Sequence, residues 1–498
     1  MDTQQIESLS RQYGGAAFSP DLNQLRGIMG LTEDDMMKAL ATNGTVGTNA
    51  SAMIGESLDP LVKRITLDPE NHCILLQRLE TYKAKAISEQ SNRITKLGLA
   101  EYYRRAEGKL GPQDAAEYQR RTKTVHFTGG VVAVTTTMAR AAEAKFDDFK
   151  AMEVANRVAA ILLATEKQLY WGDTRINALD WEGFGQQIAV DAGTSSEFQT
   201  NLVVTGTAGS RTTYISGGTL TASQIRAQAR NALKRGAVPT MCLLSSKDKE
   251  LLGVAEDTNI RYLNRDQKSG IAKGMIVDQI VLDFGGARAL DLVWSLFLDY
   301  NRGKLSDVPN DPSNADLFHE SAAPQLASGA FAGAAASGGY LPNDTYYYGI
   351  AAVSDVGEGP IRLLSTGYTA DNTNGSVDLT ITLPGDLSNI KSWRIYRSTI
   401  NGTSYANMRF VKEVALDDSA ATQVITDDGS ILPSSREAAL INEKMASLGF
   451  LQPLSAWDLP YTDSTHRVAV EGELVVQNYA PEHCHRFINI GGTAATPE

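Results

Sequence analysis

A long amphipathic segment from Phe146 to Asp173 limits what this chain can fold into more than any other stretch. Its apolar residues recur at spacings of three and four, with one step of seven, at Phe146, Phe149, Met152, Ala155, Ala159, Leu162 and Leu169. That spacing is the period of one face of an α-helix. Gly172 follows, and a glycine can take the positive φ that often ends a helix. The pattern predicts a helix over about 146–171, packed through Phe149, Met152, Val158, Leu162 and Leu169.

The composition is that of a globular protein with more than one domain. The chain has 498 residues, of which 42% are hydrophobic and 21% are charged, enough to bury a sizeable core. No apolar run reaches the length of about 18 residues that a transmembrane helix needs. The N-terminal residues also lack the basic and apolar regions of a secretory signal. The three cysteines lie far apart in the sequence, which indicates reduced thiols made in a reducing cytosol.

The net charge of −12 does not favour a chain built to grip nucleic acid. The charge is uneven, because residues 63–124 hold 13 Lys and Arg against 8 Asp and Glu, whereas residues 333–440 hold 7 against 12. A basic limb beside an acidic body is compatible with self-association. A solvated surface of either sign explains the same pattern equally well.

Two polar stretches near the N-terminus have too few apolar residues to be buried in one subunit. Residues 1–55 are expected to form an arm that lies on another part of the protein. Residues 89–124 are polar and basic, with a Gly/Pro turn at 108–112 flanked by Tyr102, Tyr103 and Tyr118. Long ordered loops are uncommon unless they are functional. This stretch is therefore predicted to be a functional two-limbed excursion.

Most of the remaining chain alternates helical and strand patterns, which predicts an α+β fold. Thr221–Arg235 is expected to be a helix that Thr221 caps and Gly236 stops. Thr240–Ser245 reads as a short buried strand before another helix, and Leu179–Ile188 reads as a loop. Further strands are expected at Ile276–Phe284, Leu290–Leu298, Arg467–Gln477 and Arg486–Ile490.

The composition changes abruptly after residue 320. Ser321–Gly339 consists almost entirely of Ala, Gly and Ser, and is predicted to be a linker. From Tyr340 to Leu432, short β-branched and aromatic runs alternate with Gly, Asn, Asp and Pro turns, which is typical of an antiparallel sandwich. The α+β pattern resumes near Leu440. The sandwich is therefore expected to be inserted into the host fold.

The sequence offers no recognisable catalytic, cofactor-binding or metal-binding motif. The glycines at 108–111 lack the spacing of a phosphate-binding loop. His483, Cys484 and His485 are adjacent, so in a strand they point to opposite faces and cannot all bind one ion. No catalytic residue, cofactor or metal is therefore expected, and the chain is not predicted to be an enzyme.

The order of these parts resembles the major capsid proteins of tailed bacteriophages with the HK97-type fold. Glu56–Asp59 follows the arm, Glu89–Thr124 corresponds to the extended loop, and Phe146–Trp171 to the spine helix. Gly236–Leu252 looks like the helix–strand–helix passage of the central domain, and Arg467–Ile490 like the closing strands. The arrangement carries the resemblance, since no single motif is specific.

The resemblance implies a domain order for the whole chain. An arm would occupy 1–55 and the capsid core 56–320, with the extended loop at about 89–124, the spine helix at about 146–171 and the central domain at about 220–320. A linker at 321–339, an inserted sandwich at 340–432 and a return to the core at 433–498 would follow. The extended loop would contact neighbouring subunits through Tyr102, Tyr103, Arg104, Arg105, Lys109 and Tyr118.

The implied function is that of a major capsid protein. Its copies would assemble into hexamers and pentamers of an icosahedral shell that encloses phage double-stranded DNA without sequence-specific binding and without a membrane. Portal and scaffolding proteins would be partners, with assembly in the host cytoplasm and a final place in the virion. Some relatives crosslink a loop Lys to an Asn; Lys109 lies near the turn, but no matching Asn and Glu motif is identifiable, so this chemistry is not expected.

The inserted segment resembles an immunoglobulin-like or fibronectin-type-III domain. Tyr346–Pro360 is similar to a late aromatic strand of that family and Ser392–Ser398 to an earlier one, in reversed order. The insert is expected to project outward and decorate the shell. It could contact neighbours or host-surface sugars there, and a spacer that binds no ligand explains the sequence at least as well as binding does. Two other functions stay open. One is an encapsulin-like shell, and the other is an enzyme with a carbohydrate-binding appendage, which would need a pair of carboxylates that the sequence does not identify.

Overall fold

The computed structural model describes residues 67, 69–96, 107–109, 115–138, 149–189, 211–234, 236–257, 278–282, 288–299, 301–304, 306, 308–312, 323–364, 366–371, 374–399, 402–460 and 464–491. The chain divides into two units, Met1–Ile65 and Thr66–Glu498, and all of the described residues belong to the second. The expected arm at 1–55 therefore lies outside the described residues. None of the described helices is long and apolar enough to span a membrane.

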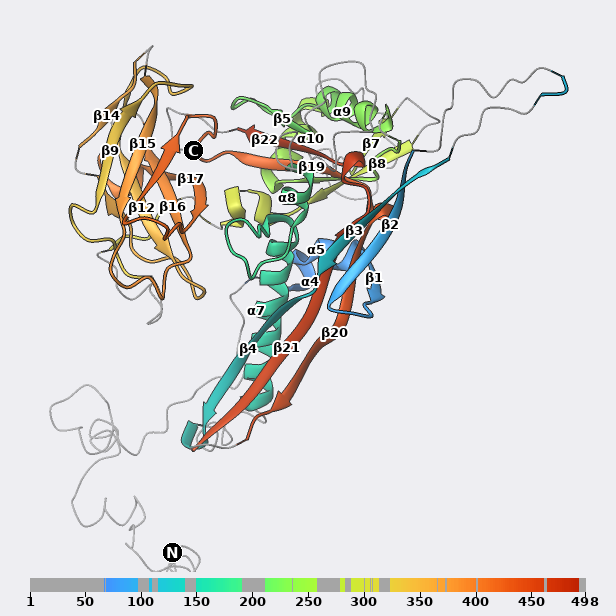
Figure 1. Ribbon diagram of the computed structural model, residues 1–498, viewed down its shortest axis with the longest axis horizontal. Helices are drawn as coiled ribbons and strands as arrows, with labels where there is room; N and C mark the ends of the chain where they lie inside the picture. The colour runs from blue at the N-terminus through green and yellow to red at the C-terminus, as the bar shows by residue number, and fades with distance from the viewer. Residues whose placement is uncertain are drawn as a thin grey trace, which may run out of the picture. The chain divides into compact units, whose positions relative to one another are not determined.

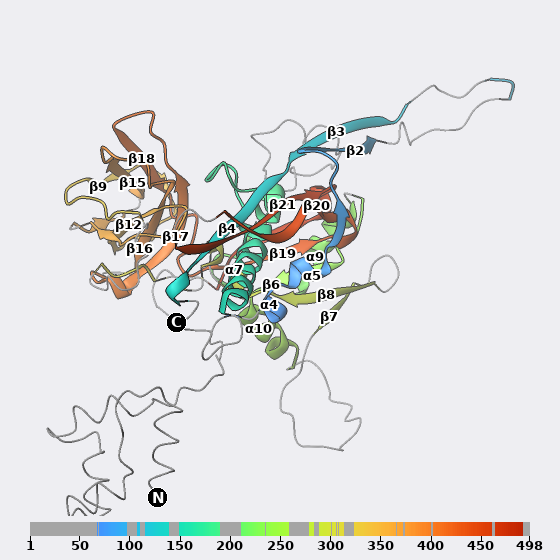
Figure 2. The ribbon, with the colours of Figure 1, turned by 90° about the horizontal axis from the view of Figure 1, so that it is seen from below.

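A long four-stranded sheet and one long helix run side by side (Figures 1 and 2). The strand order is β1 (Glu80–Lys83), β20 (Ala446–Asp458), β21 (Thr465–Asn478) and β4 (His126–Thr135). β1 is parallel to β20, and the other pairs are antiparallel. The helix α7 (Phe149–Trp171) packs on β4 and β21 through a cluster of valines, Val132, Val134, Val154 and Val468. Segments from both ends of the sequence thus build one layer.

The buried face of α7 differs from the predicted one. Of the described side chains, the fully buried ones are Ile161, Thr165, Glu166, Leu169, Tyr170 and Trp171. Met152, Val158 and Leu162 are only half-buried, Ala155 is exposed, and the side chain of Phe149 lies outside the described part. The prediction of one continuous packed face was therefore wrong for the first half of α7. Only the last two turns enter the main core.

The role assigned to Gly172 also needs correction. Its φ is not positive, unlike that of nine other glycines among the described residues. A Cβ at this position would lie 2.5 Å from the carbonyl oxygen of Trp181 and 2.7 Å from that of Gln168. The glycine is required because the returning loop passes close to the end of the helix. The Trp181 indole Nε1 then donates to the Gln168 carbonyl over 3.0 Å.

A six-stranded mixed sheet forms the second layered region. Its order is β5 (Thr212–Tyr214), β22 (His485–Ile490), β19 (Arg436–Ile441), β6 (Met241–Leu244), β8 (Arg288–Trp294) and β7 (Gln279–Leu282). One face packs on the C-terminal end of α7 and on α8 (Phe184–Ala189), and the other on α9 (Ala222–Lys234) and α10 (Ser246–Asp257). The predicted loop at 179–188 therefore contains a helix, because Phe184 and Ile188 are fully buried against this sheet.

The start of α9 follows the predicted cap. The Gln224 backbone N–H donates to the Thr221 hydroxyl over 3.4 Å, and the Gln224 side-chain oxygen accepts from the Thr221 backbone N–H over 2.9 Å. This reciprocal pair satisfies two amide groups at the helix start. At the other end, Gly236 adopts a φ of +127°, which a residue with a side chain rarely takes.

A β-rich unit, defined as the described residues from 323 to 433, interrupts this region (Figure 1). One sheet contains β9 (Phe331–Ala336), β10 (Gly338–Gly339), β15 (Asn374–Thr382) and β18 (Thr422–Asp427). The other has the order β13 (Arg362–Leu363), β12 (Tyr348–Val353), β16 (Ser392–Ser398) and β17 (Met408–Ala415). A short pair, β11 (Thr345–Tyr346) and β14 (Tyr368–Thr369), completes the unit. Its own core includes Tyr348, Leu379, Trp393 and Ile395, all fully buried.

The predicted linker at 321–339 was wrong. Phe331–Ala336 forms β9, which pairs antiparallel with β15, and Phe331 enters the core of the β-rich unit together with Ala323 and Leu326. The Ala/Gly run was assigned to a linker because it lacks apolar alternation. A strand at the edge of a sheet can nonetheless consist of small residues when its neighbour supplies the buried side chains.

Candidate assembly surfaces and the junction with the β-rich unit

The expected excursion at 89–124 contains a two-stranded hairpin, β2 (Ser88–Lys96) and β3 (Glu117–Thr124), that leaves the body (Figure 1). Its base is tied down by two arginines. Arg93 lies 3.0 Å from a Glu482 carboxylate oxygen, and Arg121 donates to the Asn478 carbonyl over 2.9 Å. The body therefore fixes where the hairpin begins.

Beyond this base, the hairpin exposes apolar side chains. Tyr118 is 72% exposed, and its cross-strand partner Ile94 is 54% exposed. Lys109, near the turn, is exposed too. The expected contact residues Tyr102, Tyr103, Arg104 and Arg105 lie outside the described residues. Ile94 and Tyr118 thus form a small exposed apolar pair on the ribbon.

The outward face of the long sheet carries a second apolar surface. Along β4, Phe127 and Val131 are 67% and 53% exposed. Val131 pairs with Ala469 of β21, and Ala469 pairs with the partly exposed Trp457 of β20, so these three residues cross the sheet in one row. The opposite face of the same strands packs on α7. One face of this sheet is therefore covered by α7, while the other leaves Phe127, Val131 and Trp457 exposed around the buried Ala469.

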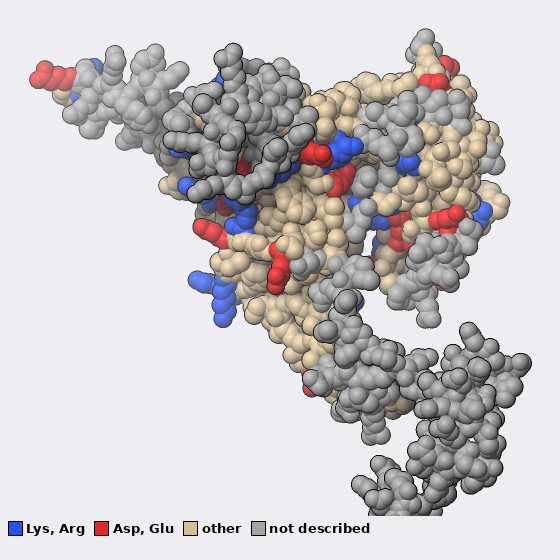
Figure 3. Space-filling view, turned by 180° about the vertical axis from the view of Figure 1, so that it is seen from behind, with Lys and Arg blue, Asp and Glu red and all other residues tan. Residues whose placement is uncertain are grey.

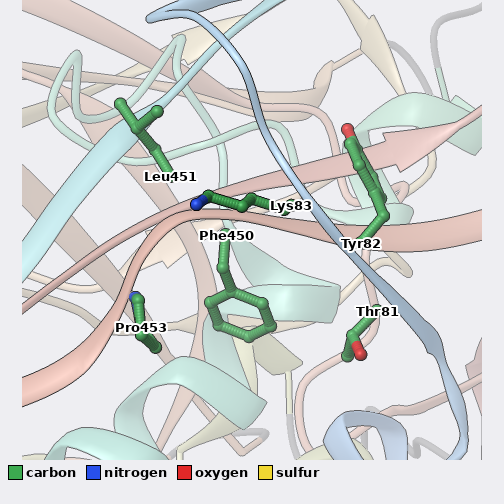
Figure 4. A pocket seen from close by; sticks show the side chains of 6 residues that line it. All are labelled: Thr81, Tyr82, Lys83, Phe450, Leu451 and Pro453. Carbon is green, nitrogen blue, oxygen red and sulfur yellow. The ribbon is translucent and has the colours of Figure 1, made fainter.

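A cavity of about 390 Å³ opens between β1 and β20, where the pairing of β20 with β21 is irregular. Figure 4 shows its six lining side chains, three from each strand: Thr81, Tyr82, Lys83, Phe450, Leu451 and Pro453. The lining is mostly apolar, and Lys83 is its one cationic group. No paired carboxylates or other catalytic arrangement line it.

Glu166 of α7 connects the helix to the segment that precedes β1. Its two carboxylate oxygens accept the backbone N–H groups of Leu75 and Leu76 over 2.8 and 2.9 Å, at the start of the short helix α5 (Ile74–Arg78). Burial raises the pKa of Glu166 to about 7, although these hydrogen bonds act in the opposite direction. A charged residue on a helix can thus be part of the core when it satisfies exposed backbone donors.

Charged side chains also lie buried where the β-rich unit meets the end of α7. We call Arg302, Lys304, Glu358, Arg394 and Glu413 the junction cluster. Lys304 lies 2.9 Å from a Glu358 carboxylate oxygen, and Arg394 lies 2.6 Å from Glu358 and 3.0 Å from Glu413. Each of these side chains is at most 16% exposed.

Arg302 links this cluster to α7. One of its guanidinium nitrogens donates to the Trp171 carbonyl over 2.9 Å, and another lies 3.8 Å from Glu413. The negative end of the helix dipole lies at the C-terminus of α7, and it also stabilises a cation at this place. Lys304 in turn lies over the rings of Tyr396 and Phe410, 4.7 and 5.5 Å from their centroids, a favourable cation–π geometry.

Burial and the neighbouring charges shift the pKa values of ionisable side chains in and around the junction cluster. Burial alone would raise the pKa of Glu413, but Arg394 and Arg302 outweigh it and lower the pKa to about 2. Burial, together with the positive charge of Arg394, lowers the pKa of Lys167, on the adjacent turn of α7, to about 8. Burial raises the pKa of Asp180 to about 6. The junction is therefore a low-dielectric contact in which charges are paired across the boundary.

On the face shown in Figure 3, acidic and basic side chains of the described residues are interspersed over short distances. This distribution gives no single-sign surface there of the kind that holds a nucleic-acid backbone.

His483, Cys484 and His485 do not form a metal site in the described part of the chain. Cys73, Cys242 and Cys484 are buried, and none of the three forms a disulfide.

Comparison with known protein families identifies the family of this chain. The family model described as SU10 major capsid protein matches residues 26–292, more than half of the chain. The chain belongs to this family. The major capsid protein therefore has a structural role as a subunit of a homo-oligomeric shell.

Solved structures show only distant similarity to this major capsid protein. The capsid of a native GTA particle has 8% identity and a TM-score of 0.43, covering 90% of this chain and 99% of the other. The capsid of phage XM1 has 7% identity and a TM-score of 0.41, with coverages of 90% and 99%. The SrpI encapsulin of Synechococcus elongatus has 9% identity and a TM-score of 0.37, with coverages of 90% and 97%. A search of the curated proteins found no match.

Sequence reasoning located the hairpin of this major capsid protein but missed the junction cluster. Its members are separated by up to 111 residues in the sequence, and no spacing rule relates them. The signal that could have found it is the pattern of β16, where charged Arg394 alternates with the aromatic and aliphatic residues Trp393 and Ile395 in an otherwise buried strand. Such alternation indicates a strand whose second face meets a charged partner.

Proposed function

We propose that this major capsid protein assembles into hexamers and pentamers of an icosahedral shell that encloses phage double-stranded DNA. The family match over residues 26–292 carries this proposal. The exposed apolar pairs on the β2–β3 hairpin and on the outer face of the long sheet support it, because an isolated soluble subunit gains nothing from leaving them open. Closed symmetry would bring copies of both surfaces together around each ring.

In this proposal the parts of the chain take the roles of an HK97-type subunit. The hairpin is the extended loop, α7 is the spine helix, and the six-stranded sheet with α9 and α10 is the central domain. Residues 1–55 form the arm. The hairpin crosses to a neighbouring subunit through Tyr118, Lys109 and the residues between them, while Arg93 and Arg121 hold its base on its own subunit.

The β-rich unit is proposed to be an immunoglobulin-like insert on the outside of the shell. Two sheets, antiparallel except for the short β10–β15 pair, enclose a core with a buried tryptophan, which supports that class of sandwich. Residues 333–440 hold an excess of acidic groups, which disfavours a place against the packaged phosphates. Portal and scaffolding proteins would be the partners in assembly, which would take place in the host cytoplasm.

The experiment is to image the purified full-length protein by negative stain and measure its sedimentation. We expect closed particles, and nuclease-protected DNA within those recovered from infected cells. A matched variant that lacks Glu101–Glu117 should stay folded and monomeric, because those residues serve neighbouring subunits. A full-length chain that sediments as a stable monomer at high concentration contradicts assembly, and normal particles from the shortened variant contradict the role of the hairpin.

A further inference from the structure

The junction cluster joins two parts of the chain that a flexible appendage would leave separate. Arg302 and Lys304 come from the segment that follows β8, whereas Glu358, Arg394 and Glu413 come from the β-rich unit. The ion pairs that cross the boundary are buried on both sides. Exposed surface pairs contribute little to orientation, but a buried pair loses its compensation when one partner moves, so it fixes geometry.

The backbone at the boundary is held in an unusual conformation. Arg302 and Gly303 have φ of +59° and +62°, in the left-handed region that non-glycine residues seldom adopt. A Cβ at Gly303 would lie 2.8 Å from the Trp171 ring and 2.9 Å from Lys167 Cγ. This turn is therefore pressed against the end of α7, and the contacts of Arg302 are what keep its strained residue in place.

A second tie holds the other end of the β-rich unit. Asn489 of β22 accepts the Leu432 N–H over 3.1 Å and donates to the Ser430 carbonyl over 2.7 Å. Both ends of the unit are thus fastened to the host fold, one near α7 and one on the six-stranded sheet. Two attachments at separate points remove the freedom to swing that one attachment would leave.

We propose that the junction cluster is a latch that locks the β-rich unit onto the C-terminal end of α7 and sets the direction in which the unit leaves the subunit. The unit then moves with α7 as one body instead of hinging at its ends. This goes beyond the proposed function, since a capsid insert could decorate a shell equally well on a loose tether.

The test uses hydrogen exchange on the full-length, unassembled chain, so that it does not depend on shell formation. Glu413→Gln removes one charge of the cluster, and Asp355→Asn removes one from the exposed pair with Lys391 in the same unit. We expect Glu413→Gln to raise exchange at least tenfold at 171–183 and 301–304 while β15 keeps its protection. Asp355→Asn should change neither region.

A double substitution sharpens the result. If Arg302 and Glu413 act together, Arg302→Gln combined with Glu413→Gln should raise exchange at 171–183 by less than the product of the two single effects. In assembled particles, imaging should resolve the β-rich unit as sharply as α7 in the wild type and less sharply in Glu413→Gln. Unchanged exchange in Glu413→Gln, or equal effects of Glu413→Gln and Asp355→Asn, overturns the latch.

Discussion

The β2–β3 hairpin and the β-rich unit both leave the body of the subunit, but they are stabilised in opposite ways. The hairpin has ties at its base and exposes Ile94 and Tyr118 beyond it. The β-rich unit has its own core around Trp393 and buries its boundary with the body through ion pairs. The described part of the hairpin thus has no core of its own, whereas the β-rich unit buries one within a single chain.

This difference distinguishes two purposes that an extending segment of a shell subunit can serve. A segment that serves assembly must keep apolar surface available, and its own chain cannot cover that surface without removing its purpose. A segment that only shapes the subunit does not need such a surface, although the β-rich unit still leaves single apolar side chains such as Val424 exposed. Substitutions in the two regions should therefore affect different measurements.

The largest expected effect follows from breaking the core of the β-rich unit. Trp393 is fully buried, and its indole donates to the Gln423 side-chain oxygen over 3.0 Å. Trp393→Ala should lower the free energy of unfolding of the unit by about 3–5 kcal/mol, measured by chemical denaturation of the monomer. The control is Trp457→Ala on the long sheet, where the indole is 39% exposed and the loss should stay below about 1 kcal/mol. Equal losses would show that the unit has no core of its own.

How far the sequence could predict these two regions depends on how local their stabilisation is. The period of α7, the buried strand β6 and the cap of α9 are properties of neighbouring residues, and each was predictable. β9 was missed because its Ala/Gly residues carry no pattern and its place depends on β15, more than 37 residues later. Pairing across such a distance is decided by tertiary structure alone.

The candidate site also has one part that local sequence predicts and other parts that depend on contacts between distant residues. The polarity of residues 89–124 indicated the hairpin, because a stretch with few apolar residues cannot build a core of its own. Glu166 was not identified, since one carboxylate inside an apolar helix has no sequence signal for the backbone donors that it meets 90 residues away. The junction cluster has no sequence signal for the same reason, since its members lie up to 111 residues apart in the sequence.

An intermediate effect is expected from acid, which should weaken the boundary of the β-rich unit and not the hairpin. Glu413 is more acidic in the folded chain, with a pKa of about 2 against an ordinary 4.5. Its contribution is therefore complete above pH 4.5 and disappears as the pH falls toward 2, amounting to about 3 kcal/mol at most. The free energy of unfolding of wild type and Glu413→Gln should thus converge on acidification, while Asp355→Asn should follow the wild type throughout. Parallel curves for wild type and Glu413→Gln would assign the stabilisation to other groups.

The smallest effect on the subunit, and the most informative about the hairpin, is expected at Tyr118. Because this side chain is 72% exposed in the isolated chain, Tyr118→Ser should change the free energy of unfolding by less than about 0.5 kcal/mol. Assembly should nevertheless weaken, since an aromatic side chain at an interface contributes more than most of its neighbours. The measurement is the protein concentration at which particles form, followed by light scattering.

The matched control for Tyr118 is Val424→Ser on β18, which removes another exposed apolar side chain, 57% exposed, from the β-rich unit. If only the hairpin serves neighbours, Val424→Ser should leave the concentration for assembly unchanged, because the β-rich unit is complete within its own chain. A Val424→Ser variant that assembles as poorly as Tyr118→Ser would mean that the unit also contacts its neighbours. The distinction between the two extensions would then be one of degree, since both would depend on surfaces that only a second copy covers.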